Sequence, residues 1–106
     1  MYSKKQQTFK RKDKAVKDKD YLGWFSQQSL PCIVCGEIQS EGHHVYSVLY
    51  GVQRDDTKII PLCTFHHRQS VDCSPHVGRR GFVEMFSLDD QLEIAKYIHD
   101  KYIHNK

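Results

Sequence analysis

Cysteine and histidine, the usual protein ligands of zinc, are frequent in this 106-residue chain, which holds four cysteines and seven histidines. Cys32 and Cys35 are separated by two residues and followed by Gly36, so a tight turn can bring both thiolates to one ion. Cys63 and His66 are three residues apart, a spacing that places both on one face of a helix. The sequence therefore predicts a structural zinc ion with all four positions filled by Cys32, Cys35, Cys63 and His66.

Two alternatives for the zinc ligands remain open at this stage. Cys73 competes with His66 for the fourth position, which would give a four-cysteine site. His67 lies four residues after Cys63 and could also share its face of a helix. The C-x2-H spacing favours His66. Such an ion would supply folding free energy that the core of so short a chain lacks.

Two pairs of adjacent histidines indicate a second site. His43 and His44 are expected to open a strand, where neighbouring side chains point to opposite faces. His66 and His67 are expected at the start of a helix, where neighbours diverge by roughly 100°. One of His43 and His44 can therefore face a metal while the other faces a substrate. One of His66 and His67 can complete the zinc site while the other points into the groove beneath the strands.

The elements that must position these residues predict a small α+β fold. We expect, in chain order, a short helix or turn near residues 21–25, strands over residues 45–50 and 57–62 joined by residues 51–56, a helix over residues 63–70, a loop over residues 72–81 and a final helix after residue 87. Ser87 is the expected N-cap of the last helix, with Asp90 in the capping-box position.

Charge divides the chain into two parts. The first 20 residues hold 8 of the 16 Lys and Arg but only 3 of the 13 Asp and Glu. We predict that residues 1–20 form a flexible basic arm, able to neutralise phosphates, and that residues 21–106 form the domain. No apolar run is long enough to cross a membrane, and residues 1–20 lack the apolar stretch that a secretory signal requires. We therefore expect a cytoplasmic protein with reduced thiols, and no membrane partner.

Three motifs in combination resemble a known family. They are Cys32-x2-Cys35, then Glu41-Gly-His43-His44-Val45, then Ile60-Pro61-Leu62-Cys63-x2-His66-His67-Arg68. Together they resemble small phage-encoded HNH-type proteins, and among these the Ref-type recombination-enhancement nucleases. The segment Ser74-Pro75-His76, followed by Gly81-Phe82, is also similar to that group. The resemblance covers about residues 21–100.

The resemblance implies a zinc-stapled treble-clef, ββα-metal fold that hydrolyses DNA phosphodiesters with one divalent cation. It implies that His44 is the general base and that His43, His67 and His76 hold the catalytic ion. An imidazole can accept a proton at neutral pH, and a divalent cation can stabilise charge on a phosphate. Histidine ligands accept Mg²⁺, Mn²⁺, Ni²⁺ or Zn²⁺, so the sequence does not name the ion. The resemblance also implies activity coupled to a recombinase filament.

The chain departs from the family pattern in two places. Val71 stands where several members have a second helix histidine, and the segment between the strands has no Asn. The third ligand of the catalytic ion is therefore open among His76, Asp56 and Asp72, and Asp56 could instead orient His44. Arg68, Arg79 and Arg80 are candidate phosphate contacts, because guanidinium suits bidentate binding. The alternative function is a non-catalytic zinc module that binds nucleic acid or a recombination protein.

Overall fold

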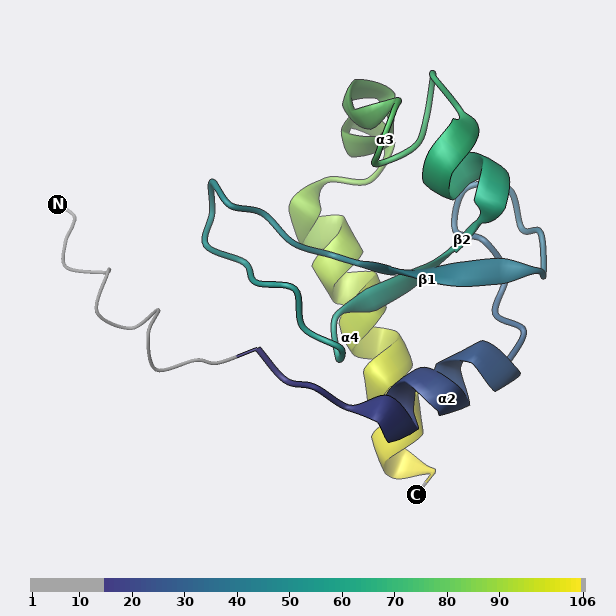
Figure 1. The fold of residues 1–106 in the computed structure, drawn as a ribbon, viewed down its shortest axis with the longest axis vertical. Coiled ribbons are helices and arrows are strands. Elements are labelled where there is room, and N and C mark those ends of the chain that lie inside the picture. The colour runs from purple at the N-terminus through teal and green to yellow at the C-terminus, as the bar shows by residue number, and fades with distance from the viewer. Residues whose placement is uncertain (1–14, 106) are drawn as a thin grey trace, which may run out of the picture.

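The computed structural model describes residues 15–105. The elements along this part of the chain are α2 (Lys19–Gln27), β1 (Ser40–His44), β2 (Ile59–Cys63), the π-helix η2 (Phe65–Gln69), α3 (Arg79–Met85) and α4 (Leu88–His104) (Figure 1). The predicted α+β class is therefore confirmed at this coarse level. Among the described helices, none combines the length and the apolar character needed to cross a bilayer.

The sheet is one antiparallel pair, in which His43 lies opposite Ile60 and His44 lies opposite Ile59. The first strand was predicted over residues 45–50, but β1 ends at His44, so the two histidines close the strand rather than open it. Residues 45–58 form a long loop that projects from the sheet (Figure 1). Its apolar tip is 92% exposed at Val48 and 81% exposed at Leu49, and the pairing across it in the described residues is limited to one isolated bridge, between Ser47 and Val52. Propensity for β structure did not suffice without a neighbouring strand.

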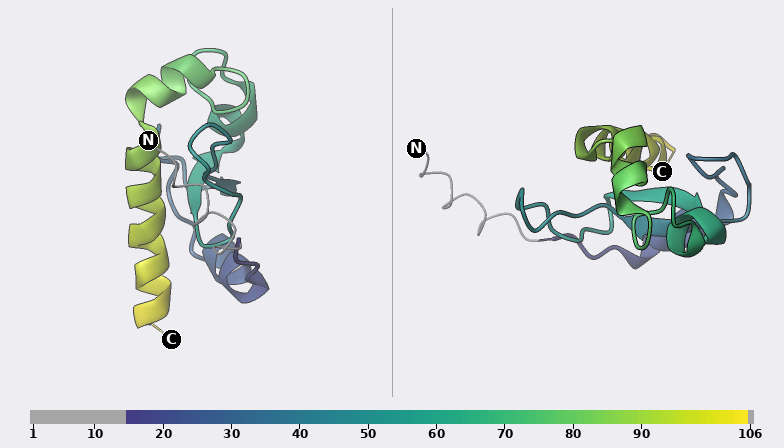
Figure 2. Two further views of the ribbon diagram at one scale, coloured as in Figure 1. Left: turned by 90° about the vertical axis from the view of Figure 1, so that its left-hand side faces the viewer. Right: turned by 90° about the horizontal axis from the view of Figure 1, so that it is seen from above.

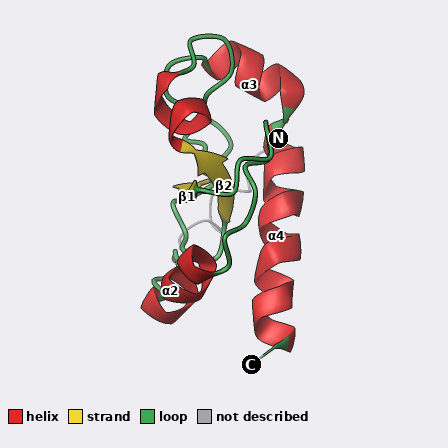
Figure 3. Ribbon diagram, turned by 90° about the vertical axis from the view of Figure 1, so that its right-hand side faces the viewer, coloured by secondary structure: helices red, strands yellow, loops and turns green. Residues whose placement is uncertain are grey.

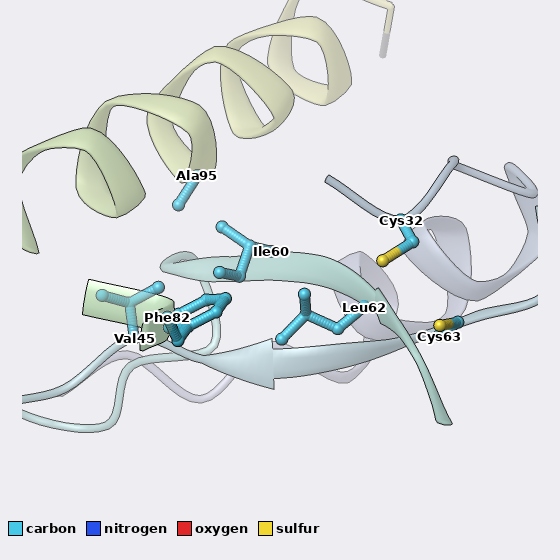
Figure 4. Packing of buried hydrophobic residues seen from close by; sticks show 7 residues of the cluster. All are labelled: Cys32, Val45, Ile60, Leu62, Cys63, Phe82 and Ala95. Carbon is cyan, nitrogen blue, oxygen red and sulfur yellow. The ribbon is translucent and has the colours of Figure 1, made fainter. Parts of the chain in front are cut away.

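Helices cover the sheet from two sides. Figures 2 and 3 show α4 running along one side of the sheet and α2 on the opposite side. Directly paired residues share a face, so Ile60 points to the same side as His43. Ile60 packs with Phe82 of α3 and Ala95 of α4 in one buried cluster (Figure 4). A second cluster joins Tyr21, Phe25, Ile59 and Ile98.

The final helix begins as its sequence predicts. The Ser87 hydroxyl accepts a hydrogen bond from the Asp90 N–H at 3.1 Å, and the Asp90 carboxylate accepts one from the Ser87 N–H at 3.2 Å. This reciprocal capping box satisfies two backbone donors that the first turn would leave without partners. The predicted cap of α4 is confirmed.

The segment between η2 and α3 is tighter than the predicted loop over residues 72–81, because α3 already begins at Arg79. Gly78 and Gly81 allow this close approach. A Cβ at Gly81 would lie 1.8 Å from the Asp72 carbonyl oxygen, and one at Gly78 would lie 2.6 Å from that of Ser70. Both glycines therefore let the loop after η2 lie directly against the start of α3.

The predicted arm over residues 1–20 is too long at its C-terminal end, and its residues 1–14 lie outside the described part. The Val16 N–H donates to Asp55 Oδ2 at 3.1 Å, and the Asp18 N–H donates to Asp56 Oδ2 at 2.8 Å. Asp18 also caps α2 by accepting from the Tyr21 N–H at 3.0 Å. Backbone pairing with two carboxylates thus fixes residues 16–18 against the 45–58 loop.

Asp55 should make the fold sensitive to acid. This carboxylate is 5% exposed and also accepts from the Thr57 N–H at 2.8 Å. Burial acts to raise the pKa of Asp55, but hydrogen bonds from Thr57 and Val16 outweigh it and lower the pKa. A carboxyl whose pKa is lower in the folded state stabilises the fold above its unfolded pKa of about 3.9 and loses that effect as the pH falls further.

We predict that Asp55→Asn lowers the free energy of unfolding at pH 7 by about 1–3 kcal/mol. The difference between the wild type and the variant should shrink as the pH falls below about 4. Urea unfolding at pH 7 and at a pH below about 4 measures the free energy of unfolding of both proteins, with Asp89→Asn on the surface of α4 as the control. A difference that does not change with pH would contradict the role of the charge.

Candidate metal centres

The four residues predicted as zinc ligands lie together. The ligand atoms of Cys32, Cys35, Cys63 and His66 are all within 4.8 Å of one another. Cys35 Sγ lies 3.7 Å from Cys63 Sγ, and Cys63 Sγ lies 3.4 Å from His66 Nδ1. Zn–S bonds of about 2.3 Å at tetrahedral angles separate two sulfurs by about 3.8 Å. The cluster therefore has the size and donor set to hold a metal ion such as zinc.

Backbone hydrogen bonds hold the knuckle that carries the first two cysteines. The Gly36 N–H donates to the Cys32 carbonyl at 2.8 Å, and Gly36 has a φ of 85°, which few other residues adopt easily. The Ile33 N–H donates to the Pro61 carbonyl at 3.1 Å, which attaches the knuckle to β2. Cys63 ends β2, so the same strand delivers the third ligand.

Backbone N–H groups also act on the thiols. The Val34 N–H lies 3.4 Å from Cys32 Sγ. Burial acts to raise the pKa of Cys32, but N–H groups of Cys63, Cys35 and Val34 together lower it. The pKa of Cys63, by contrast, is raised, first by burial. A lowered thiol pKa suits metal binding, because the thiolate is the ligand.

The four-cysteine alternative is not assembled in the structure. Cys73 is not a member of the cluster, and its Sγ lies 3.9 Å from Met85 Sδ. Burial raises the pKa of the Cys73 thiol, which favours the neutral form. Cys73 thus sits with the apolar side chains around the core, and His66 takes the fourth position of the cluster.

A second cluster brings together three imidazoles, those of His43, His67 and His76. His67 Nε2 lies 3.2 Å from His43 Nδ1 and 3.2 Å from His76 Nε2. Two nitrogens bound to one zinc at about 2.0–2.1 Å and tetrahedral angles are about 3.3 Å apart. Three nitrogens at this spacing can hold a divalent ion and leave coordination positions open.

Different elements supply the three imidazoles. His43 is the fourth residue of β1, and His67 is the third residue of η2. His76 lies in a tight turn closed by the bridge between Ser74 and Gly78. Ser74 is fully buried, and its hydroxyl donates to the Ser70 carbonyl at 2.8 Å, which ties the turn to the end of η2.

Glu41 fixes the orientation of the central imidazole. Its Oε1 accepts from His67 Nδ1 at 2.6 Å, which leaves Nε2 of His67 with its lone pair directed at the other two rings. Thr64 Oγ1 and Arg68 Nε also donate to this carboxylate, at 2.8 and 3.2 Å. The hydrogen bond from His67, then those from Thr64 and Arg68, lower the pKa of Glu41 to about 2. A carboxylate behind a ligating histidine is the usual outer partner of a metal site.

The surroundings favour neutral rings at the two outer positions. Burial, followed by the neighbouring imidazoles, lowers the pKa of His43 to about 3. Burial and then the nearby His67 and Arg68 lower the pKa of His76 as well. The neutral form is the one that binds metal, because its free nitrogen carries the lone pair.

His44 lies apart from the three imidazoles. The side chain of His44 lies on the same face of β1 as Gly42, and this face packs near Phe25 of α2. His43 lies on the opposite face, with Ile60. His44 Nε2 lies 2.9 Å from Asp56 Oδ1, and the His44 side chain is 34% exposed. This hydrogen bond, followed by that from the Asp18 N–H, lowers the pKa of Asp56. Of the two roles considered for Asp56, the structure shows it as the partner of His44.

His76, rather than Asp56 or Asp72, completes the imidazole cluster. Asp56 is bonded to His44 and is not a member of the imidazole cluster, and Asp72 is exposed and outside it too. The predicted zinc and catalytic-ion residues therefore occupy two separate clusters, joined through the adjacent residues His66 and His67.

The three predicted phosphate-binding arginines lie in different settings. Arg79 lines a pocket of about 520 Å³ together with His43 and His76. Arg68 bonds to Glu41, with its side chain 62% exposed. Arg80 has a 94% exposed side chain and pairs with Glu84 on its own helix at 3.5 Å.

Two contributions were missed by sequence reasoning. Glu41 belongs to the quoted motif, but its carboxylate reaches His67 across 26 residues of sequence, which no local spacing reveals. Arg54 lies with its guanidinium 3.8 Å from the Tyr46 ring centre, and its charge contributes to lowering the pKa of His43. No sequence signal distinguished Arg54 from other loop arginines.

Comparison of the chain with protein-family models, curated proteins and solved structures finds no match. The resemblance to HNH-type nucleases therefore stays a prediction, and the geometry of the two clusters carries the functional argument.

Cys35→Ser tests the first cluster. Cys35 is exposed, so its sulfur contributes little to packing, and the variant should act through loss of a metal ligand. We predict that it purifies with about one zinc equivalent less and loses several kcal/mol of stability, since zinc binding supplies folding free energy. Elemental analysis and thermal unfolding measure both, with Cys73→Ser as the matched control. Equal zinc content in the two variants would contradict the assignment.

Glu41→Gln tests the second cluster. The substitution keeps the shape of the side chain but removes the charge that orients His67. Loss of such an outer partner should weaken metal binding about 10–100-fold. Zinc-loaded protein is titrated with Co²⁺, and the visible absorption of bound Co²⁺ gives the affinity of the imidazole cluster for the ion. Glu37→Gln, at an exposed acid, is the control. An unchanged affinity would show that Glu41 has only a surface role.

Proposed function

We propose that this chain is a metal-dependent nuclease that hydrolyses DNA phosphodiesters. The observation that supports it best is the convergence of His43, His67 and His76 on one point, with His67 oriented by Glu41. Three nitrogen donors leave coordination positions for a substrate oxygen, in contrast to the four-ligand cysteine cluster, which leaves none. A bound divalent ion would stabilise charge on the phosphate and on the leaving oxygen.

The order of elements is consistent with a zinc-stapled treble-clef, ββα-metal arrangement of the HNH type. The knuckle at Cys32 and Cys35 precedes β1, β1 pairs with β2, and η2 follows with ligands for both ions. We propose zinc as the structural ion, and Mg²⁺, Mn²⁺, Ni²⁺ or Zn²⁺ as the catalytic ion. A cytoplasmic location would suit a site that depends on reduced thiols.

His44 is the proposed general base. Asp56 accepts the Nε2 hydrogen, which leaves the lone pair on Nδ1 and holds the ring in that tautomer. Asp56 is in turn fixed by the Asp18 N–H. Nδ1 of His44 would take a proton from the attacking water, and Asp56 would stabilise the resulting imidazolium.

Positive side chains near the imidazoles suit a polyanionic partner. Arg79 lines the pocket beside His43 and His76, and Arg68 lies next to His67. These arginines would bind phosphates on either side of the scissile bond. Arg80 is proposed only as a peripheral contact. DNA is the proposed partner, and a recombinase filament would present it, as the family resemblance implies.

The position of His44 favours a second candidate function. Its side chain lies on the opposite face of β1 from His43, and Asp56 already occupies one of its nitrogens. A site without an available base would hold an ion and bind nucleic acid or a recombination protein without cutting it. Cleavage by wild-type protein and by a His44 variant separates the two candidates.

We expect purified protein to nick supercoiled plasmid with Mg²⁺, Mn²⁺ or Ni²⁺, and we expect His44→Ala to lower the rate about 10²–10⁴-fold, the usual contribution of a general base. Gel analysis of the nicked form over time measures the rate. His104→Ala, at the exposed end of α4, is the matched control and should keep full activity. Zinc content and thermal unfolding verify that both variants are folded.

Equal nicking by wild type and His44→Ala would remove His44 from the mechanism. Absence of nicking by the wild type with each ion, with and without an added recombinase filament on DNA, would favour the binding module.

A further inference from the structure

The pocket beside the imidazole cluster has two walls of different chemistry. Residues 47–50, at the exposed tip of the long loop, form one wall, and α3 with the first turns of α4 forms the other. His43 and His76 line the same pocket, so whatever fills it lies next to the nitrogens that could hold an ion. Its volume of about 520 Å³ falls in the range of small-ligand sites, roughly 300–1,000 Å³.

The lining combines flat apolar surface with a few polar groups. Leu49 and Tyr50 are 81% and 73% exposed, although they line a pocket. Gln91 is buried and lines the pocket, and its Nε2 donates to the Phe86 carbonyl at 2.9 Å. Arg79 adds a positive charge.

We propose that this pocket holds an unpaired nucleobase next to the scissile phosphate, and that the substrate of the nuclease is therefore single-stranded at this point. Apolar and aromatic side chains such as Leu49 and Tyr50 are poorly suited to a phosphate backbone but suit the face of a base. The side-chain amide of Gln91 can bond a polar group on the edge of the base. Arg79 lies where it can pair with the adjoining phosphate.

A paired base would not reach these walls. In a duplex the base faces are covered by their neighbours, so only an unstacked base can enter a pocket and stack on side chains. The inference rests on the proposed function for the nature of the substrate, but it makes a claim about binding that does not require cleavage.

The test measures binding by zinc-loaded protein without cleavage. The probe is a 12-nucleotide DNA strand with phosphorothioate linkages, which resist hydrolysis, and a central 2-aminopurine. Fluorescence anisotropy gives its affinity, and 2-aminopurine emission reports whether the base leaves its neighbours. We expect the single strand to bind at least about fivefold more tightly than the same strand in a duplex, the effect of one stacked base.

Two variants and one matched control locate the effect. Val83→Trp fills the pocket from α3, and Leu49→Ala removes part of its other wall at an exposed position that packing does not hold. Both should reduce the preference for the single strand and the change in 2-aminopurine emission. Val71→Trp places the same large side chain at a 76% exposed valine outside the pocket and should leave both unchanged.

The proposal is overturned if the duplex binds as tightly as the single strand, if neither form binds, or if both pocket variants behave like Val71→Trp. Failure of the proposed function gives a different result. Preference for the single strand without nicking of any DNA would keep the pocket and discard the nuclease, whereas nicking without that preference would do the reverse.

Discussion

Antiparallel pairing of β1 with β2 sets the positions of both candidate metal-binding clusters, because the register of the pairing decides which side chains share a face. Glu41 and His43 point to one side of β1, and Gly42 and His44 point to the other. A slip of one residue would exchange these sets and would separate Glu41 from His67. At the end of β2, the same pairing places Cys63 near the knuckle that Ile33 attaches to the strand. The sheet is small, yet it positions candidate ligands of both clusters, since β1 carries His43 and β2 ends at Cys63.

The hydrophobic core around this sheet is small: in the described residues the sheet has two strands, and the buried apolar side chains divide into two clusters. Polar interactions supply the remaining order. Asp55 and Asp56 hold the backbone of residues 16–18, and Ser74 holds the turn of His76. Small domains commonly need such supplements, of which a structural metal is one. An ion held by Cys32, Cys35, Cys63 and His66 would have that effect here.

The features that the sequence predicted correctly were those that depend on residues close together in the chain. Cys63 and His66 are close in the chain, and the Ser87 cap depends only on the next turn of α4. The predicted strand over residues 45–50 was wrong, because this segment forms one isolated bridge, Ser47 with Val52, and is not part of either described strand. Glu41 was beyond sequence reasoning because its carboxylate meets His67 from 26 residues away in the chain, whereas Asp56 was named as a possible partner of His44 and only the fold decided between that role and the ligand role. Spacing indicated the ligands, whereas the residues that orient them came from the fold.

Because His66 and His67 are consecutive residues of η2, the two clusters share one short helix. An ion bound through His66 would order η2. An ion that then binds through His67 would have less conformational freedom of the same helix to remove. Occupancy of one site should therefore raise affinity at the other, and thermodynamic reciprocity requires the converse effect to be equal. An ion at the imidazole cluster would thus slow the loss of zinc to a chelator, so the two proposed ions would be retained or lost together.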